Sequence, residues 1–488
     1  MRIIGASVMF VCDERFSVVK NGGVVFENGC IIESGEYEAL VQKYMPESSR
    51  DTCEFFEDCV LLPALINAHI HFEFSSNSTS FTYGSFEGWL ASVMARRDDV
   101  LGSMQESIES SINEQLDSGV GSVGAISSYG DDMEILAHSP LKVVYFSEVI
   151  GSNPAAVDML FSHFKERFTR AMSLASKLAL DSGTAERGER LAPESSLPRF
   201  RAPRFFPAIA IHSPYSVHSV LAKHVISFGR EMFRERGIVQ EREQDSHAPA
   251  RVINPCERSC SFSAHFLESN AERVWLESGG ASGVDCGAKS SEESGGWFYD
   301  FYTKTLGLKN PRPYYTIESF MQQFWGERVA FVHGVAMSEA ESRALIDSGA
   351  HLLTCPRSNR LLGGSMLKLQ GLDSRLAARL GIGSDGASSN ANTNMLDELR
   401  AGLFGMEYPL DWLARILLLA ATRGNASALG LANGSLEQGR SADMAVFAIK
   451  GIADSSQPAV HFIMLARKAL RLYIDGEQVD RVGDKAEG

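Results

Sequence analysis

The chain has 488 residues, 44% hydrophobic and 22% charged, which is enough to bury the core of one large α/β barrel with an appendage, or of about two or three domains. Its net charge of −15 and pI near 5.4 argue against nucleic acid as a partner, because phosphate binding needs a basic surface. No apolar run reaches the ~20 residues of a membrane span, and the amino terminus lacks signal-peptide features. The eight cysteines are scattered without zinc-type spacing, which favours free thiols in a reducing cytosol. We therefore expect a cytoplasmic protein without nucleic-acid or membrane partners.

The two ends of the chain both predict β-structure. Residues 1–60 alternate short apolar runs with Asn-Gly turn signals, as antiparallel strands do. Near the other end, residues 441–449 and 468–479 are also strand-like. We expect a composite β-sandwich built from residues 1–60 and 436–488, with residues 61–435 as the central unit.

The middle of the chain alternates apolar β-like runs with amphipathic segments of helix length. This alternation predicts parallel strands in βαβ units. Eight runs fit a (β/α)8 barrel of the TIM type, an α/β fold whose chemistry lies at the C-terminal ends of the strands. The candidate strands are residues 60–71, 120–127, 141–150, 205–212, 261–267, 329–333, 351–355 and 379–384.

Three hydrophilic stretches interrupt the alternation. They are rich in Ser, Gly, Pro and charged residues, a composition that favours disorder over packed structure. They comprise residues 181–203, 240–259 and 279–296.

Two histidines lie one residue apart at the end of the first candidate barrel strand. His69 and His71 stand in the sequence LLPALINAHIHFEF. Residues i and i+2 of a strand share a face, and imidazole is a preferred ligand of Zn and Fe. Because such pairs are common without a metal, the other strand ends decide the interpretation.

Further candidate residues close later strands. His265 and Glu268 occur in SAHFLES, which offers a ligand beside a carboxyl group for proton transfer. His333 ends VAFVH, where a neutral imidazole can orient water. Asp385 closes GIGSDG, either as a turn residue or as a metal ligand and proton acceptor. Together these residues predict a metal-dependent site at one end of the barrel.

The ligand types indicate which metal to expect. Imidazole and carboxylate without thiolate suit Zn²⁺ or Fe²⁺. A binuclear site needs a bridging group such as a carboxylated lysine, and the fourth candidate strand, RFFPAIAIHSPYS, has no lysine at its end. We therefore expect one divalent metal ion, Zn²⁺ or Fe²⁺.

The same motifs carry a family resemblance. The chain resembles the amidohydrolase superfamily, in its deaminase and chlorohydrolase branch, through LLPALINAHIH, HSPYS at 212–216, AHFLES, FVHG, LTCPRSNRLLGG and GIGSDGASSN. The stretches INAHIHFEFSSNSTSFTYGSFEGWL, SGVGSVGAIS, HFLES, GWFYDFY and TCPRSNRLL look, more narrowly, like the aminofutalosine deaminases of the futalosine route to menaquinone. The three hydrophilic stretches depart from that pattern.

The resemblance implies roles for individual residues. Glu268 would move protons at the purine N1, and His333 would position the attacking hydroxide. His212 would contact the substrate away from the chemistry, while Glu73 and Trp89 lie in stretches that form the substrate pocket in such enzymes. The implied metal ligands are His69, His71, His265 and Asp385.

The implied reaction is hydrolytic deamination of 6-amino-6-deoxyfutalosine to futalosine and ammonia, with an aminopurine nucleoside as the small-molecule partner. The sequence leaves open deamination of adenosine, methylthioadenosine or S-adenosylhomocysteine, a chlorohydrolase reaction, and a non-catalytic binding module. It also leaves open a homodimer. The benzoate-type carboxylate of futalosine calls for a cation, and the candidates are Arg96, Arg97, Arg357 and Arg360.

Overall fold

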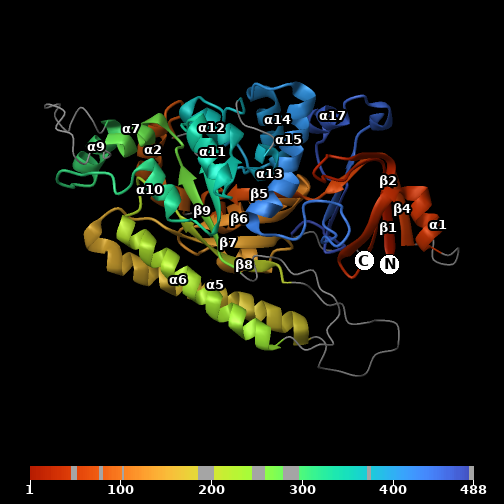
Figure 1. The fold of residues 1–488 in the computed structure, drawn as a ribbon, viewed down its shortest axis with the longest axis horizontal. Coiled ribbons are helices and arrows are strands. Elements are labelled where there is room, and N and C mark those ends of the chain that lie inside the picture. Colours follow the sequence, from red (N-terminus) through yellow and green to blue (C-terminus); the bar gives the residue numbers. More distant parts are fainter. Residues whose placement is uncertain are drawn as a thin grey trace.

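The computed structural model describes residues 1–45, 52–75, 81–101, 104–184, 203–243, 259–278, 296–370 and 375–482. Its strands form two sheets, an eight-stranded sheet in the middle of the chain and a seven-stranded sheet from the two ends (Figure 1). The predicted α/β barrel is confirmed, and so is the meeting of the terminal segments. None of the described helices has the length and apolar content that crossing a membrane requires.

The barrel strands follow one another in chain order and all pair in parallel. Their interior is filled by apolar side chains, including Ile66, Val144, Phe146 and Val332. The strands are β5 (Leu65–Ile70), β6 (Val120–Ser127), β7 (Lys142–Val149), β8 (Phe205–Ile211), β9 (Ser261–Phe266), β10 (Arg328–His333), β11 (His351–Thr354) and β12 (Leu380–Ile382).

The first predicted strand, residues 60–71, is wrong as a single element. The extended segment is interrupted at Ala64. The part before it, β4 (Cys53–Pro63), belongs to the terminal sheet, and the part after it, β5, belongs to the barrel. Hydropathy could not separate the two, because both are buried and apolar up to the break.

A side-chain amide joins β5 and β12, the first and last strands of the barrel. Asn425 donates from Nδ2 to the carbonyl oxygens of Ile66 at 2.5 Å and Ile382 at 2.7 Å. Its Oδ1 accepts from the Ile382 N–H at 2.9 Å. Farther along, the Asp385 N–H donates to the His69 carbonyl at 3.0 Å, so the two strands also meet where they carry candidate ligands.

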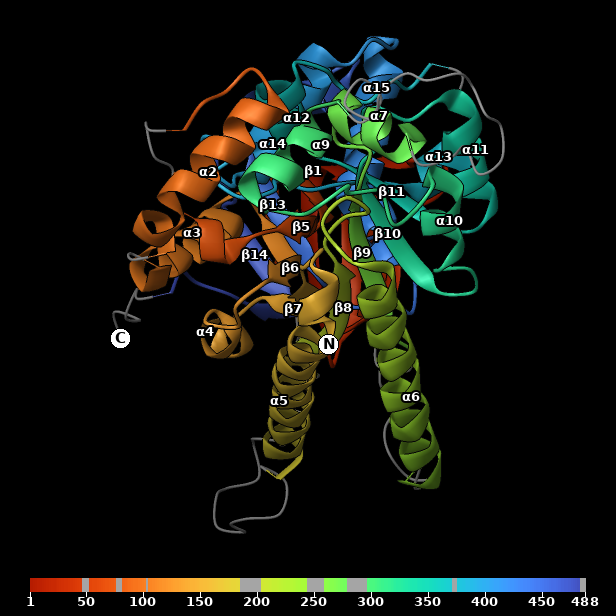
Figure 2. The same cartoon turned by 90° about the vertical axis from the view of Figure 1, so that its left-hand side faces the viewer.

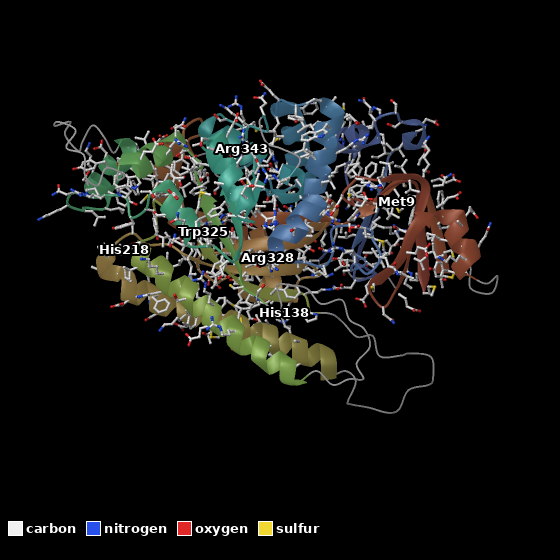
Figure 3. The ribbon with its side chains drawn as sticks, viewed as in Figure 1. Met9, His138, His218, Trp325, Arg328 and Arg343 are labelled. Atoms are coloured by element: carbon white, nitrogen blue, oxygen red, sulfur yellow. The ribbon has the colours of Figure 1, made fainter. Side chains whose placement is uncertain are left out.

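The terminal sheet has the order β15-β14-β13-β4-β1-β2-β3. It mixes antiparallel pairs with the parallel pair β1–β4. Figure 3 places Met9 of β1 within it, and His218 at the far side of the molecule beside the long helices. The strands besides β4 are β1 (Arg2–Phe10), β2 (Val18–Glu27), β3 (Cys30–Glu36), β13 (Met444–Ala448), β14 (Arg471–Ile474) and β15 (Glu477–Gln478).

A buried lysine connects this sheet to the barrel. Lys142, at the start of β7, is 1% exposed. Its Nζ lies 2.8 Å from Asp443 Oδ2 and 2.6 Å from Asp475 Oδ1, and it donates to Ser441 Oγ at 2.7 Å. Burial opposes the charge of Lys142, but the two carboxylates outweigh it and raise the pKa of the lysine.

Helices surround the barrel strands (Figure 2). Local signals fix several of their ends: a capping box at Ser338 and Glu341 begins α11, and Gly364 in the left-handed region ends α12. The helices are α1 (Tyr37–Tyr44), α2 (Phe86–Leu101), α3 (Met104–Asp117), α4 (Met133–His138), α5 (Val157–Thr184), α6 (Ser219–Glu243), α7 (Asn270–Ser278), α9 (Gly296–Asp300), α10 (Ile317–Gln322), α11 (Glu339–Asp347), α12 (Pro356–Gly363), α13 (Arg375–Arg379), α14 (Met395–Gly405), α15 (Leu410–Leu419), α16 (Asn425–Leu429) and α17 (Pro458–Leu465).

The helices α5 and α6 extend well beyond the barrel in Figure 2. They take in the first residues of two hydrophilic stretches, 181–184 and 240–243. Residues 185–202, 244–258 and 279–295 of the three stretches lie outside the described residues.

Candidate active site

Four side chains converge at the C-terminal end of the barrel. His69 Nε2 lies 3.2 Å from His71 Nε2 and 3.0 Å from His265 Nε2. Asp385 Oδ1 lies 3.7 Å from His69 Nε2 and 3.5 Å from His71 Nε2. The structure thus brings together the four residues that the resemblance named as ligands.

A bulge in β5 aims the two histidines at the same cavity. Between Asn67 and Ile70 the strand contains one residue more than its partner β6. Such a bulge turns the following side chains to the other face. Ile66 and Ala68 point into the barrel interior and Ile70 points outward, so His69 and His71 both face inward.

Two hydroxyl groups orient Asp385. Its Oδ2 accepts from Ser358 Oγ at 2.7 Å and from Ser389 Oγ at 2.8 Å, which leaves Oδ1 toward the histidines. Burial alone would raise the pKa of Asp385, but the neighbouring imidazoles of His69 and His71 bring it well below its ordinary value. The carboxylate is therefore ionised at neutral pH.

The histidines must be uncharged to bind a metal ion, whereas Asp385 must be ionised. Burial lowers the pKa of His71 to about 3, that of His69 below its ordinary value, and that of His265 far below it. Neutral imidazoles have a free lone pair on one ring nitrogen, which is the form that binds metals.

These residues fit a divalent cation. In a tetrahedral site with Zn–N bonds of about 2.0–2.1 Å, two ligand atoms lie about 3.3 Å apart. The four spacings given above, 3.0, 3.2, 3.5 and 3.7 Å, bracket that value. Ring nitrogens held this close need either a proton or a cation between them, and a cation can satisfy all of them at once.

Glu268 and His333 lie beside the cluster. His333 Nε2 is 3.6 Å from Glu268 Oε1, and His333 Nδ1 is 2.8 Å from Asn359 Oδ1. Because the amide oxygen can only accept, His333 carries its proton on Nδ1 and leaves a lone pair on Nε2. Burial, followed by repulsion from Asp385, raises the pKa of Glu268 far above its ordinary value, which favours the protonated form of Glu268.

A second glutamate fixes the turn that presents Glu268. Glu272 Oε1 accepts from the Leu267 N–H and Oε2 from the Glu268 N–H, each at 3.0 Å. Leu267 has a φ of +49°, a conformation that is costly for a branched side chain. Glu272 is thus a positioning residue that stabilises a strained turn.

His212 and Glu148 line the other side of the cluster. One ligand atom of each lies within 4.8 Å of the other and of His265. His212 Nδ1 is 2.7 Å from Ser216 Oγ and 3.2 Å from Ser213 Oγ. Burial lowers the pKa of His212 to about 4 and raises that of Glu148 to about 8.

The carboxylate of Glu73 is engaged by the protein. It accepts from the backbone N–H groups of Ser128, Tyr129 and Gly130 and from Ser127 Oγ, at 2.7–3.1 Å. The structure therefore gives Glu73 a role in holding the loop after β6. Its contact with a substrate stays a prediction.

Trp89 is half-buried on α2. Its Nε1 donates to the Ser388 carbonyl at 3.0 Å, in the loop that follows Asp385. This places Trp89 against the rim of the site, while its contact with a substrate also stays a prediction.

Sequence reasoning missed several side chains of the site. Ser358 and Asn359 lie in TCPRSNRLL, a stretch that carried the resemblance without a role for either residue. Glu272 follows four residues after Glu268, and Glu148 closes the apolar run of β7. A polar residue at the end of a buried strand was the signal available for Glu148.

The fold and the site define a class of enzyme. Eight parallel strands whose ends bring together imidazoles and carboxyl groups are the arrangement of a barrel hydrolase with a candidate metal site. Residues 60–479 match the model of the amidohydrolase family, and the chain belongs to that family. The family generally uses a divalent metal ion.

The chain is similar to deaminases along its whole length. It is 35% identical over 480 residues to a protein of Helicobacter pylori named adenosine deaminase, and the match covers 98% of this chain and 99% of that protein. It is 33% identical over 444 residues to the aminodeoxyfutalosine deaminase of a Nitratiruptor species, with 90% and 91% covered. These relatives confirm the expectation of a deaminating hydrolase.

A solved structure gives the same result. The aminofutalosine deaminase of Helicobacter pylori, in complex with methylthio-coformycin, superposes with a TM-score of 0.77 at 34% identity. The match covers 98% of this chain and 100% of that one. The predicted resemblance is thus confirmed at the level of sequence and fold.

Proposed function

We propose that the protein hydrolyses the 6-amino group of 6-amino-6-deoxyfutalosine, giving futalosine and ammonia on the route to menaquinone. The convergence of three imidazoles and the Asp385 carboxylate, with Glu268 and His333 beside them, carries the proposal chemically. The similarity to an aminodeoxyfutalosine deaminase over nine-tenths of the chain supports this substrate.

The metal centre would be held by His69, His71, His265 and Asp385. A divalent cation bound there, Zn²⁺ or Fe²⁺, lowers the pKa of water toward neutrality and so supplies hydroxide near pH 7. Thiolate ligands are absent from the cluster of described residues, which agrees with the predicted metals.

The protein groups divide the proton transfers between them. Asp385, ionised and turned toward the ligands by Ser358 and Ser389, accepts the proton of the attacking water. Glu268, protonated and buried, donates to the purine N1 and relieves the charge that develops as C6 is attacked.

His333 positions the nucleophile. Its Nδ1–H is fixed by Asn359, so the Nε2 lone pair can accept a hydrogen bond at the reaction centre. The φ of +75° at His333 shows that the backbone is held in an uncommon conformation to present this ring. His212 would contact the substrate on the opposite flank.

Deamination of adenosine is the second candidate, because a relative of similar identity and coverage carries that name. The two candidate substrates differ in the part of the molecule that is distant from the purine. Arg357 donates to Glu398 Oε1, Asn392 Oδ1 and the Asn394 carbonyl, so its guanidinium is already used within the protein. Arg360 is exposed on α12 and is the better candidate for the futalosine carboxylate.

The first experiment measures ammonia release from 6-amino-6-deoxyfutalosine, adenosine, methylthioadenosine and S-adenosylhomocysteine. We expect a preference of about a hundredfold or more in kcat/KM for the futalosine compound, about 2.7 kcal/mol of transition-state discrimination. A preference for one of the others would keep the deaminase chemistry and refute the menaquinone assignment.

A further inference from the structure

Glu148 is a buried carboxyl group beside the metal-ligand cluster. It is the second-last residue of β7, and strand alternation places it on the same face as Val144 and Phe146, which fill the barrel interior. It is 2% exposed. Burying such a group is costly unless it is hydrogen-bonded or paired.

The protein satisfies this carboxyl group only in part. Glu148 Oε2 accepts from Ser128 Oγ at 2.5 Å, and the Ser128 N–H is held in turn by Glu73 Oε2 at 2.7 Å. Arg167, the neighbouring cation, donates at 2.6 Å to the Glu148 backbone carbonyl instead of its carboxylate. Within the described part of the chain, the other oxygen, Oε1, has no hydrogen-bond donor.

The position of Glu148 relative to Glu268 is the key observation. The order of the barrel strands is β7, β8, β9, β10, with Glu148 on β7 and Glu268 just after β9. Glu148 approaches the metal-ligand cluster from the side of His212, within 4.8 Å of His265, whereas Glu268 approaches from the side of His333. The two carboxyl groups therefore flank the reaction centre.

A 6-aminopurine presents complementary groups to these two flanks. N1 and the 6-amino group lie side by side on one edge of the base, so a purine whose N1 faces Glu268 still directs one of the two amino N–H groups, the one on the N7 side, away from Glu268. N1 and N7 accept hydrogen bonds, and the amino group is the N–H donor at this end of the base. A fixed carboxyl oxygen is the matching acceptor.

We propose that Glu148 accepts hydrogen bonds from the 6-amino group of the substrate and from the ammonia that departs, and so selects an amine as the leaving group. This inference rests on the proposed aminopurine deaminase function. It adds a residue on β7 to the site and separates the recognition of the leaving group from the protonation of N1.

The step balances without a further reactant. Water adds its oxygen to C6, and Asp385 takes one of its protons. Glu268 gives its proton to N1. The C6–N bond then breaks with its electron pair remaining on nitrogen, which receives the proton from Asp385 and leaves as ammonia. The proton of the hydroxyl group now on C6 passes to Glu268, which restores that acid and leaves a C6 carbonyl beside N1–H. Glu148 holds the N–H groups throughout and is chemically unchanged.

A chloride leaving group tests this role. It has no N–H to donate, so a Glu148 oxygen that accepts hydrogen bonds gains nothing from it. The assay compares the aminopurine nucleoside that the wild type prefers with its 6-chloro analogue, since both give the same product. We expect Glu148→Gln to lower kcat/KM for the amine about 10- to 100-fold and to change kcat/KM for the chloride by less than about threefold.

Glu268→Gln is the matched control, because N1 must be protonated whichever group leaves. It should lower hydrolysis of both substrates. Ser128→Ala gives a second test that keeps the Glu148 carboxylate: loss of its anchor should lower deamination selectively, by a smaller factor. Metal content is measured for every variant and should equal that of the wild type.

Equal losses for amine and chloride in Glu148→Gln, or no loss for either, would overturn the assignment. Loss of metal from Glu148→Gln would also overturn it, in favour of a role in holding the ligands. Release of neither ammonia nor chloride by the wild type would instead reject the deaminase function on which the inference rests.

Discussion

Two buried carboxyl groups in one cavity have opposite charge states because their neighbours differ. Asp385 faces imidazoles and is held by two hydroxyl groups, and its pKa falls far below the ordinary value. Glu268 has burial and a nearby carboxylate acting on it, and its pKa rises. Such a pair of environments supplies a proton acceptor and a proton donor at the same pH.

Glu268→Gln should retain the metal and lose turnover by about 10²-fold or more, because the amide cannot deliver a proton to N1. The measurements are metal content and kcat/KM for deamination. Since the raised pKa favours the protonated form of Glu268, wild-type kcat/KM should fall as the pH rises through that pKa, and this alkaline limb should be absent in the variant. Near-normal turnover of the variant would remove Glu268 from the mechanism.

At the scale of elements, the site depends on the close approach of β5 and the end of β12. A Cβ at Gly383 would lie 2.7 Å from the His69 Cβ and 2.7 Å from the His69 carbonyl oxygen. Only glycine allows the two chain segments to approach so closely. The distance between His69 and Asp385 therefore depends on a residue that is not itself a ligand.

Gly383→Ala should therefore push the two segments apart, weaken metal binding and lower stability. Metal content after dialysis against a chelator and the midpoint of thermal unfolding measure the two effects. Gly35→Ala is the matched control, because a Cβ there has nothing within 4 Å and Gly35 has no positive φ. Full metal retention by Gly383→Ala would show that β5 and the segment after β12 can move apart without loss of the metal site.

The elements also show what the sequence could reveal. The alternation of apolar runs predicted the barrel strands to within one or two residues at most ends, and polar residues at those ends predicted which side chains meet. It could not predict the bulge in β5, the break at Ala64 or the amide of Asn425, because each depends on a partner strand distant in the chain. Glu272 was missed for a related reason: its role consists of hydrogen bonds to a backbone turn.

At the scale of the whole molecule, Lys142 joins the barrel to the terminal sheet. Removing a partner from a buried ion pair leaves the remaining charge without compensation. Lys142→Met should therefore lower the free energy of unfolding by about 3–5 kcal/mol, measured by urea denaturation. Lys43→Met, which removes the exposed pair with Glu33, should cause a much smaller change. Equal effects of the two substitutions would mean that the junction contributes no more than a surface contact.

The closure of the barrel between its first strand, β5, and its last strand, β12, has one more consequence. The four proposed ligands come from the first, fifth and last barrel strands, and His71 and Asp385 lie on either side of the point where the sheet closes on itself. A bound cation would act there as a cross-link between distant parts of the chain, in the way that a disulfide closes a large loop. Metal binding and the pairing of the first and last strands are then linked equilibria. The metal concentration would therefore determine the stability of the closed barrel as well as the rate of turnover.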